Sequence, residues 1–228
     1  MQTNIFGNDL PGVSIRLDAG ESVYTQAGGM AWMDEGIKMD TNLKGGLLSG
    51  IGRMFSGESL FMATYTATRA NQEIVFASTF PGKIIELEIN PHNVWICQKS
   101  AFLVGQPTVS LSVEWTKRFS AGAFGGEGFI LQKLSGNGKA FIETAGSVVE
   151  RTLAPGEVIK VDTGNVVAFQ QSVSYEIETV KGFKNIFFGG EGLFLTKITG
   201  PGKVYLQTLT MQNVAGRIIP YIPVQSSH

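Results

Sequence analysis

The 228-residue chain carries 18 Lys and Arg residues against 19 Asp and Glu residues, which gives a formal net charge of -1. A near-neutral chain has no long-range field that would gather phosphate backbones, so nucleic-acid binding is not expected. Charged residues make up only 16% of the chain and hydrophobic residues 43%. This composition predicts that much of the surface is buried, within the fold or against copies of the same chain.

The cysteine content and the apolar segments of the sequence indicate the cellular compartment. Cys97 is the only cysteine, which excludes an intramolecular disulfide and fits a reducing compartment. It lies in the apolar run Val94-Trp95-Ile96-Cys97, where a buried thiol is the expected role. The first ten residues show neither a signal nor a transit peptide, and no apolar run is long enough to span a membrane. We therefore expect a cytoplasmic protein.

Alternating apolar and polar residues predict strands with one buried face along the chain. The clearest runs are Ile85–Ile89, Leu111–Trp115 and Ile159–Asp162. The 29 glycines indicate many tight turns, and no helical periodicity extends beyond about two turns. Asn137-Gly138 and Pro201-Gly202 have the composition of tight turns and predict a β-hairpin at each place. The predicted fold class is all-β.

An internal repeat organises these strands. Residues 125–144 align without gaps to residues 189–208, with ten of the twenty positions identical, and Phe55-Ser56-Gly57-Glu58 begins a weaker third copy. Two further marks suggest the same division: the glutamines Gln26, Gln98 and Gln170, and the Pro-Gly pairs at 81–82 and 155–156 with a degenerate copy at 19–21. We predict three β lobes, 1–78, 79–151 and 152–228, the last with a C-terminal arm, in one compact unit.

Residues that would carry catalysis are scarce. The two histidines are His92, in a predicted turn, and the terminal His228, and no Gly-x-Ser-x-Gly motif is present. Glycine precedes lysine at Gly138-Lys139 and Gly202-Lys203, but these sequences lack the other glycine of a phosphate-binding loop and lead into strands. The sequence therefore predicts a binding or scaffold protein without a cofactor rather than an enzyme.

The repeated Phe-(Ser/Gly)-Gly-Glu motif supplies three equivalent carboxylates, Glu58, Glu127 and Glu191. In a structural role, each glutamate would accept hydrogen bonds from turn amides or pair with a lysine. Alternatively, the three could converge near a common axis and bind a cation or a basic group, because unpaired carboxylates that meet would repel one another. They are the candidate ligands of a carboxylate-based metal site.

The segment 45–55 is rich in glycine and apolar residues and has no acidic residue. It either covers the core or forms a surface for self-association or membrane contact, with Leu47, Leu48, Ile51 and Met54 as the contact residues. The C-terminal run from Ile218 to Pro223 contains two prolines, which exclude it from a central strand. We expect it to be an arm along a sheet edge or a neighbouring molecule.

Taken together, the Gly-Gly-Glu-Gly repeats, the Pro-Gly-Glu strand start and the run Gly57-Glu58-Ser59-Leu60-Phe61 resemble the altered-inheritance-of-mitochondria family, formerly a family of unknown function. The resemblance covers essentially the whole chain. It implies three lobes similar to the tryptophan RNA-binding attenuation protein fold, a compact antiparallel sandwich related to the double-stranded β-helix, about a pseudo-threefold axis. It also implies a link to membrane organisation, since eukaryotic relatives are associated with the mitochondrial inner membrane. RNA binding does not follow from the fold alone.

We predict that replacing Leu47 and Leu48 together with Asp leaves the chain folded but disrupts self-association or lipid binding. The first unit has the longest span between its glutamine and its Phe-Gly-Glu mark, and exposing each Leu to water costs about 1.5–3 kcal/mol, so a second surface should cover them. Light scattering and liposome co-sedimentation measure the two effects. An unfolded double variant, or one that behaves like the parent in both assays, would contradict the prediction.

Overall fold

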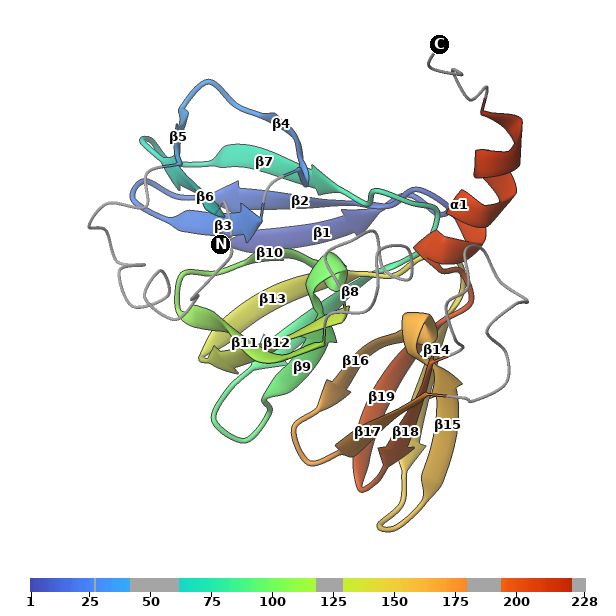
Figure 1. Cartoon of the computed structure of the whole chain (residues 1–228). Coiled ribbons are helices and arrows are strands. Elements are labelled where there is room, and N and C mark those ends of the chain that lie inside the picture. The colour runs from blue at the N-terminus through green and yellow to red at the C-terminus, as the bar shows by residue number, and fades with distance from the viewer. Residues whose placement is uncertain (27, 42–61, 118–128, 180–193, 223–228) are drawn as a thin grey trace.

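A computed structural model describes residues 1–26, 28–41, 62–117, 129–179 and 194–222. Within these ranges the chain forms nineteen strands, three short 3-10 helices and one α-helix (Figure 1). The predicted all-β class is confirmed, and the alternating runs at 85–89, 111–115 and 159–162 all lie in strands.

The strands form four antiparallel sheets, numbered here in chain order. Sheet 1 has the order β1 (Gln2–Phe6), β2 (Gly12–Leu17), β7 (Gln72–Ala77), β4 (Met30–Met33). Sheet 2 has the order β5 (Ile37–Asp40), β6 (Met62–Ala67), β3 (Ser22–Gln26), β10 (Phe102–Gly105), β13 (Gly138–Glu143), β8 (Ile84–Ile89). Sheet 3 has the order β11 (Val109–Lys117), β12 (Phe129–Gly136), β9 (Trp95–Gln98), β16 (Val166–Gln170), β19 (Gly202–Gln207), β14 (Val148–Leu153). Sheet 4 has the order β15 (Val158–Asp162), β18 (Phe194–Thr199), β17 (Ser174–Thr179).

After β1, the strands fall into three successive sets of six, β2–β7, β8–β13 and β14–β19, which we call units 1 to 3. In each unit the first, sixth and third strands pair in one sheet, and the second, fifth and fourth strands pair in the next sheet. The second strand of one unit also pairs with the third strand of the following unit, as β3 with β10 and β9 with β16. Sheets 2 and 3 are therefore each shared by two units.

Local details recur at matching places in the three units. The third strand of each unit pairs with the sixth across a one-residue register shift, between Met30 and Trp32, Phe102 and Val104, and Val166 and Ala168. At the end of the same strand, a side-chain oxygen accepts a hydrogen bond from the first backbone N–H groups of the sixth strand. These pairs are Asp34–Glu73 at 2.8 Å, Gln106–Lys139 at 2.7 Å and Gln170–Lys203 at 2.9 Å. The recurrence fixes which residues correspond between units.

This correspondence corrects two of the marks used to align the sequence. Gln26 and Gln98 end second strands, whereas Gln170 ends a third strand and corresponds to Gln106. Pro81 precedes a first strand and Pro155 a second strand, so they are not equivalent. Gln26 and Gln98 are equivalent, so only the second interval of 72 residues, from Gln98 to Gln170, is a coincidence. The boundary predicted at 151/152 falls inside β14, and the one at 78/79 falls between β7 and β8.

The two predicted hairpins are wrong. At Asn137-Gly138 the chain passes from β12 in sheet 3 to β13 in sheet 2, and at Pro201-Gly202 it passes from β18 in sheet 4 to β19 in sheet 3. Neither pair of strands shares a ladder, because each strand bonds to other neighbours. The glycines still serve the turn, since Gly138 and Gly202 adopt φ values of 152° and 145°, which disfavour other residues. They make a corner between sheets instead of a hairpin.

Three hydrophobic cores lie between successive sheets. Representative buried residues are Val13, Ile74, Phe76, Val104 and Phe141 between sheets 1 and 2; Tyr24, Leu87, Trp95, Cys97 and Leu134 between sheets 2 and 3; and Ile96, Leu131, Phe169, Ile198 and Val204 between sheets 3 and 4. Sheets 2 and 3 are thus covered on both faces. This explains the continuous apolar run at Val94–Cys97, in which Trp95 and Cys97 face one core and Ile96 the other.

The C-terminal segment contains a helix that the sequence did not predict. Helix α1 (Met211–Ile218) begins at Thr210, whose hydroxyl accepts a hydrogen bond from the Asn213 N–H at 3.2 Å, and η3 (Ile219–Tyr221) follows. The other short helices are η1 (Lys99–Ala101) and η2 (Thr163–Asn165). The helix projects beside the sheets (Figure 1), and none of its side chains is fully buried. Residues 218–221 are therefore helical, and the predicted contact of this segment with a sheet edge or a neighbouring molecule stays a prediction.

We predict that Phe141→Ala destabilises the protein by about 3–5 kcal/mol, because it empties a fully buried position. Phe141 belongs to a strand of unit 2 but packs in the core between sheets 1 and 2, so both lobes should lose stability together. Urea denaturation followed by circular dichroism gives the free energy of unfolding. Met39→Ala, at an exposed position, is the control. A change below about 1 kcal/mol, or loss of the second lobe alone, would contradict this account.

Candidate interaction surface

The residues that the sequence singled out for function lie outside the described part of the chain. Glu58, Glu127 and Glu191 fall in the segments 42–61, 118–128 and 180–193, each of which directly precedes the fifth strand of its unit. Leu47, Leu48, Ile51 and Met54 also fall in the first of these segments. The carboxylate site and the apolar contact segment therefore stay predictions. In the described ranges, no three His, Cys, Asp or Glu side chains stand close enough to hold a metal ion.

Cys97 lies in the core between sheets 2 and 3 and is fully buried. Burial raises the pKa of its thiol to about 12, so the thiol is protonated at neutral pH. The neighbouring Tyr24 hydroxyl has a raised pKa for the same reason and donates a hydrogen bond to the Val109 carbonyl at 2.9 Å. A protonated, inaccessible thiol is a poor nucleophile and a poor metal ligand, which supports its structural role.

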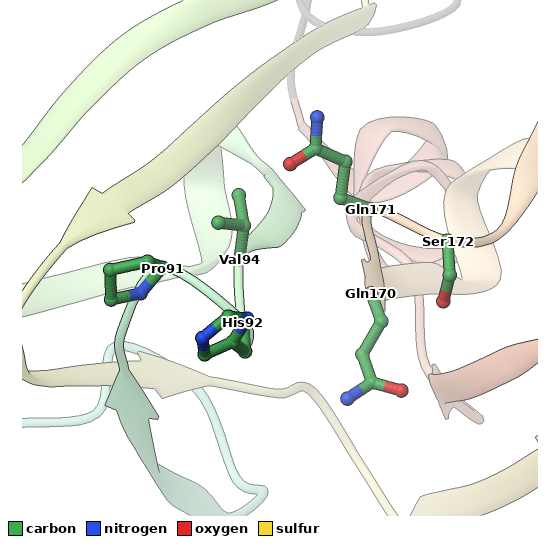
Figure 2. A pocket seen from close by; sticks show the side chains of 6 residues that line it. All are labelled: Pro91, His92, Val94, Gln170, Gln171 and Ser172. Atoms are coloured by element: carbon green, nitrogen blue, oxygen red, sulfur yellow. The ribbon is translucent and has the colours of Figure 1, made fainter.

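A small hollow of about 100 Å³ marks the seam between units 2 and 3. Its wall comes from the turn after β8 and the turn after β16, and Figure 2 shows Pro91, His92, Val94, Gln170, Gln171 and Ser172 around it. The Gln170 amide is already engaged, since it donates to Asn93 Oδ1 at 3.0 Å and accepts from the Lys203 N–H. The hollow is therefore a feature of the joint between units, and its size suits a few water molecules.

The two joints between units are built in the same way. At the second joint, Cys97, Ile96 and Trp95 of β9 stand opposite Ala168, Phe169 and Gln170 of β16. At the first joint, Tyr24 of β3 stands opposite Gly105 of β10. Tyr24 corresponds to Ile96 and Gly105 to Phe169, so both joints have the same register. Beyond the ladder, the Gln171 N–H donates to the Val94 carbonyl at 3.0 Å and extends the second joint into the turn.

The same two strand positions are left open at the two ends of the series. The third strand of unit 1 is β4 and the second strand of unit 3 is β15; in the described structure each pairs on one side only, with β7 and β18 respectively. Trp32 of β4 is 54% exposed, whereas the corresponding Val104 and Ala168 are fully buried. Val161 of β15 is half-buried, whereas the corresponding Cys97 is fully buried. Strand positions that are buried in the middle of the series are thus partly or largely exposed in β4 and β15.

Charge accompanies the open edge of sheet 4. Lys160 pairs with Glu178 at 2.8 Å, and Lys197 pairs with Glu176 at 3.4 Å. The hydrogen bond from Lys160 lowers the pKa of the Glu178 carboxyl. Lys160 corresponds to Tyr24 of β3 and Ile96 of β9. The edge strand β15 therefore carries a charged side chain where the interior strands β3 and β9 carry a buried one. Lysine on an edge strand discourages unspecific strand pairing.

On sheet 1 the open edge is aromatic. Trp32 lies next to Phe6, with ring centroids 6.3 Å apart, and Leu10 is exposed in the loop that follows β1. Phe6 also covers Gly12, where an added Cβ would stand 2.6 Å from the ring. The two open strands therefore differ at these positions: β4 exposes the aromatic Trp32, and β15 carries the charged Lys160.

These features of the described residues define a class of protein: an all-β chain of successive lobes that share their sheets, with a strand at each end that pairs on one side only. The chain matches the family described as mitochondrial biogenesis AIM24 over residues 3–209, and it belongs to that family, which confirms the resemblance seen in the sequence. It is 31% identical over 225 residues to an uncharacterised protein of Streptococcus pyogenes serotype M6, covering 95% of this chain and 89% of that one. The X-ray structure of protein SPYM3_0169 from Streptococcus pyogenes has a TM-score of 0.78 and 30% identity, with coverage of 97% and 99%.

We predict that Cys97 does not react with a thiol reagent such as DTNB in the native protein at pH 8, four units below the pKa of about 12. In denaturant the thiol becomes accessible, and one thiol per chain should then react. The denatured sample is the internal control for reagent and concentration. Complete reaction of the native protein within minutes would show that the thiol is reached without unfolding and would contradict its placement in the core.

Proposed function

We propose that the protein is a non-enzymatic scaffold that associates with copies of itself and offers the assembled surface to other partners. One observation carries the proposal: in the described part of the chain, large apolar side chains are exposed in units 1 and 3, in β1 and its loop and in the C-terminal segment, but not in unit 2. Within the described ranges, the exposed ones all lie between residues 5 and 39 or between residues 149 and 222. They are Ile5, Phe6, Leu10, Trp32, Met39, Val149, Val158, Met211, Ile218, Ile219, Tyr221 and Ile222.

The distribution supports contact between molecules for a physical reason. Apolar side chains that gather on a surface typically mark an interaction site, whereas scattered ones need no explanation. Here the middle of the molecule has buried its apolar surface against neighbouring units, and the ends have no further unit to meet. A second copy supplies matching surface, and most soluble oligomers are formed from identical chains.

Peripheral contact with a membrane is the second candidate, favoured by the C-terminal segment. Ile218, the last residue of the amphipathic helix α1, is more than half exposed, and so are Ile219, Tyr221 and Ile222, which follow it. An exposed apolar strip of this kind suits the interface between water and lipid. No helix in the described ranges is long and apolar enough to cross a membrane.

We predict that the protein in solution has a mass that is a multiple of the 24.5 kDa chain. Size-exclusion chromatography with multi-angle light scattering measures the mass over a dilution series. Salt should dissociate the assembly little, because the exposed side chains at both ends include large apolar groups. A monomer at every concentration would contradict self-association. In that case, co-sedimentation with phospholipid vesicles would test the second candidate with the same sample.

A further inference from the structure

We propose that β15 of one copy pairs antiparallel with β4 of the next copy, so that sheet 4 of one molecule continues into sheet 1 of its neighbour. The inference rests on the proposed self-association and names its interface. It requires a partner of one kind only, a second copy of this chain, because the two edges come from the same repeat. The contact would reproduce, between molecules, the joint that already connects units 1 and 2 and units 2 and 3.

The other free edges of the molecule show why these two are special. In sheet 2 the outermost strands are a fourth strand, β5, and a first strand, β8; in sheet 3 they are a fourth strand, β11, and a first strand, β14. In both six-stranded sheets, which two units share, the outermost strands are therefore a fourth strand and a first strand. Second and third strands are interior in both shared sheets, and among the strands of this kind that the structure describes only β15 and β4 stand at an edge.

The internal joints also give the register of the proposed ladder. Ile96 stands opposite Phe169, and the corresponding Tyr24 stands opposite Gly105. Transferring this pair to the ends places Lys160 opposite Met33 of the next copy. The neighbouring pair Cys97–Ala168 then places Val161 opposite Trp32, which would cover the exposed indole.

The backbone hydrogen bonds at the ends agree with this register. The Asp34 N–H donates to the Glu73 carbonyl at 2.9 Å, and the Gly200 N–H donates to the Glu157 carbonyl at 2.9 Å. The backbone N–H of Asp34 and the backbone C=O of Glu157 therefore point to the paired strand within their own sheets. Since amide direction alternates along a strand, Met33 and Lys160 direct their N–H and C=O groups to the open side. The two residues that the register pairs are thus the two whose backbone groups can exchange hydrogen bonds.

Charge and symmetry favour the head-to-tail arrangement. Two copies of β15 pairing with each other about their centres would place Lys160 against Lys160, and like charges directly opposite one another destabilise a ladder. Pairing β15 with β4 instead sets the lysine against Met33. Such a contact uses different surfaces on the two molecules, so successive copies form a ring if the rotation closes and a filament if it does not.

Proline at the two open-side amides tests the pairing without removing bonds inside the sheets. We expect Met33→Pro and Lys160→Pro each to reduce the wild-type assembly to monomer in light scattering, because each removes one donor of the ladder. Met39→Pro, on the exposed edge strand β5, and Lys160→Ala, which keeps the N–H, should both leave the assembly intact. Circular dichroism verifies that the variants are folded.

Mixing the two proline variants distinguishes the head-to-tail contact from a symmetric one. Met33→Pro retains an intact β15 and Lys160→Pro an intact β4, so an equimolar mixture should form a dimer that cannot grow. A symmetric interface through one of these edges would instead leave one of the two variants dimeric by itself, before mixing. If the wild type is assembled and both proline variants stay assembled, the interface is wrong while the proposed self-association stands. If the wild type is a monomer, the proposed function and this inference both fail.

Cysteine pairs test the register even if a proline variant does not fold. Trp32→Cys combined with Val161→Cys should form disulfides between chains under mild oxidation, because opposite residues in such a ladder have Cα atoms about 4.5–5.5 Å apart. The buried Cys97 does not interfere. Trp32→Cys with Lys160→Cys, one residue out of register, should cross-link far less. A disulfide confined to single chains, or equal cross-linking by both pairs, would overturn the proposal.

Discussion

The structure depends on one contact, the antiparallel pairing of the second strand of each unit with the third strand of the next. This pairing makes sheets 2 and 3 continuous across two units, so each of them contributes to the cores on both of its faces. Phe141 of unit 2, for example, lies in the core between sheets 1 and 2. A unit removed from the series would therefore lose part of its core as well as a neighbour. The stability of each lobe is coupled to the next through shared backbone as well as through side chains.

The same contact explains the surface. Where a unit has neighbours on both sides, its second and third strands are buried and rich in apolar residues. Where the series ends, the corresponding strands keep part of that character, as Trp32 shows, or carry charge, as Lys160 shows. Natural sheets protect free edges with charge, bulges and short strands. Both edges use these devices: β4 is four residues long with a bulge, and β15 carries Lys160 and Asp162. An edge protected in this way selects its partner by register and charge.

The proposed function rests on the architecture of the described residues and not on a reactive group. The thiol of Cys97 is buried with a raised pKa, and the hollow beside His92 is a small seam whose amide is already hydrogen-bonded. The solved relative from Streptococcus pyogenes matches 97% of this chain with a TM-score of 0.78, so the two proteins share the overall fold. An activity that resides in the joints would require no catalytic residue.

The sequence by itself determined the all-β class, the strands at 85–89, 111–115 and 159–162, the family and the burial of Cys97, because period-two alternation, motifs and apolar runs are local signals. The tertiary structure alone decided which strands pair. Asn137-Gly138 shows that the chain reverses, but the hydrogen bonds of β12 and β13 go to other strands, and turn chemistry does not reveal this. Gln170 likewise looked equivalent to Gln98 by spacing, yet its oxygen holds Lys203 as Gln106 holds Lys139. Only the tertiary structure shows that β4 and β15 are edge strands, because the strands on either side of a given strand come from distant parts of the sequence.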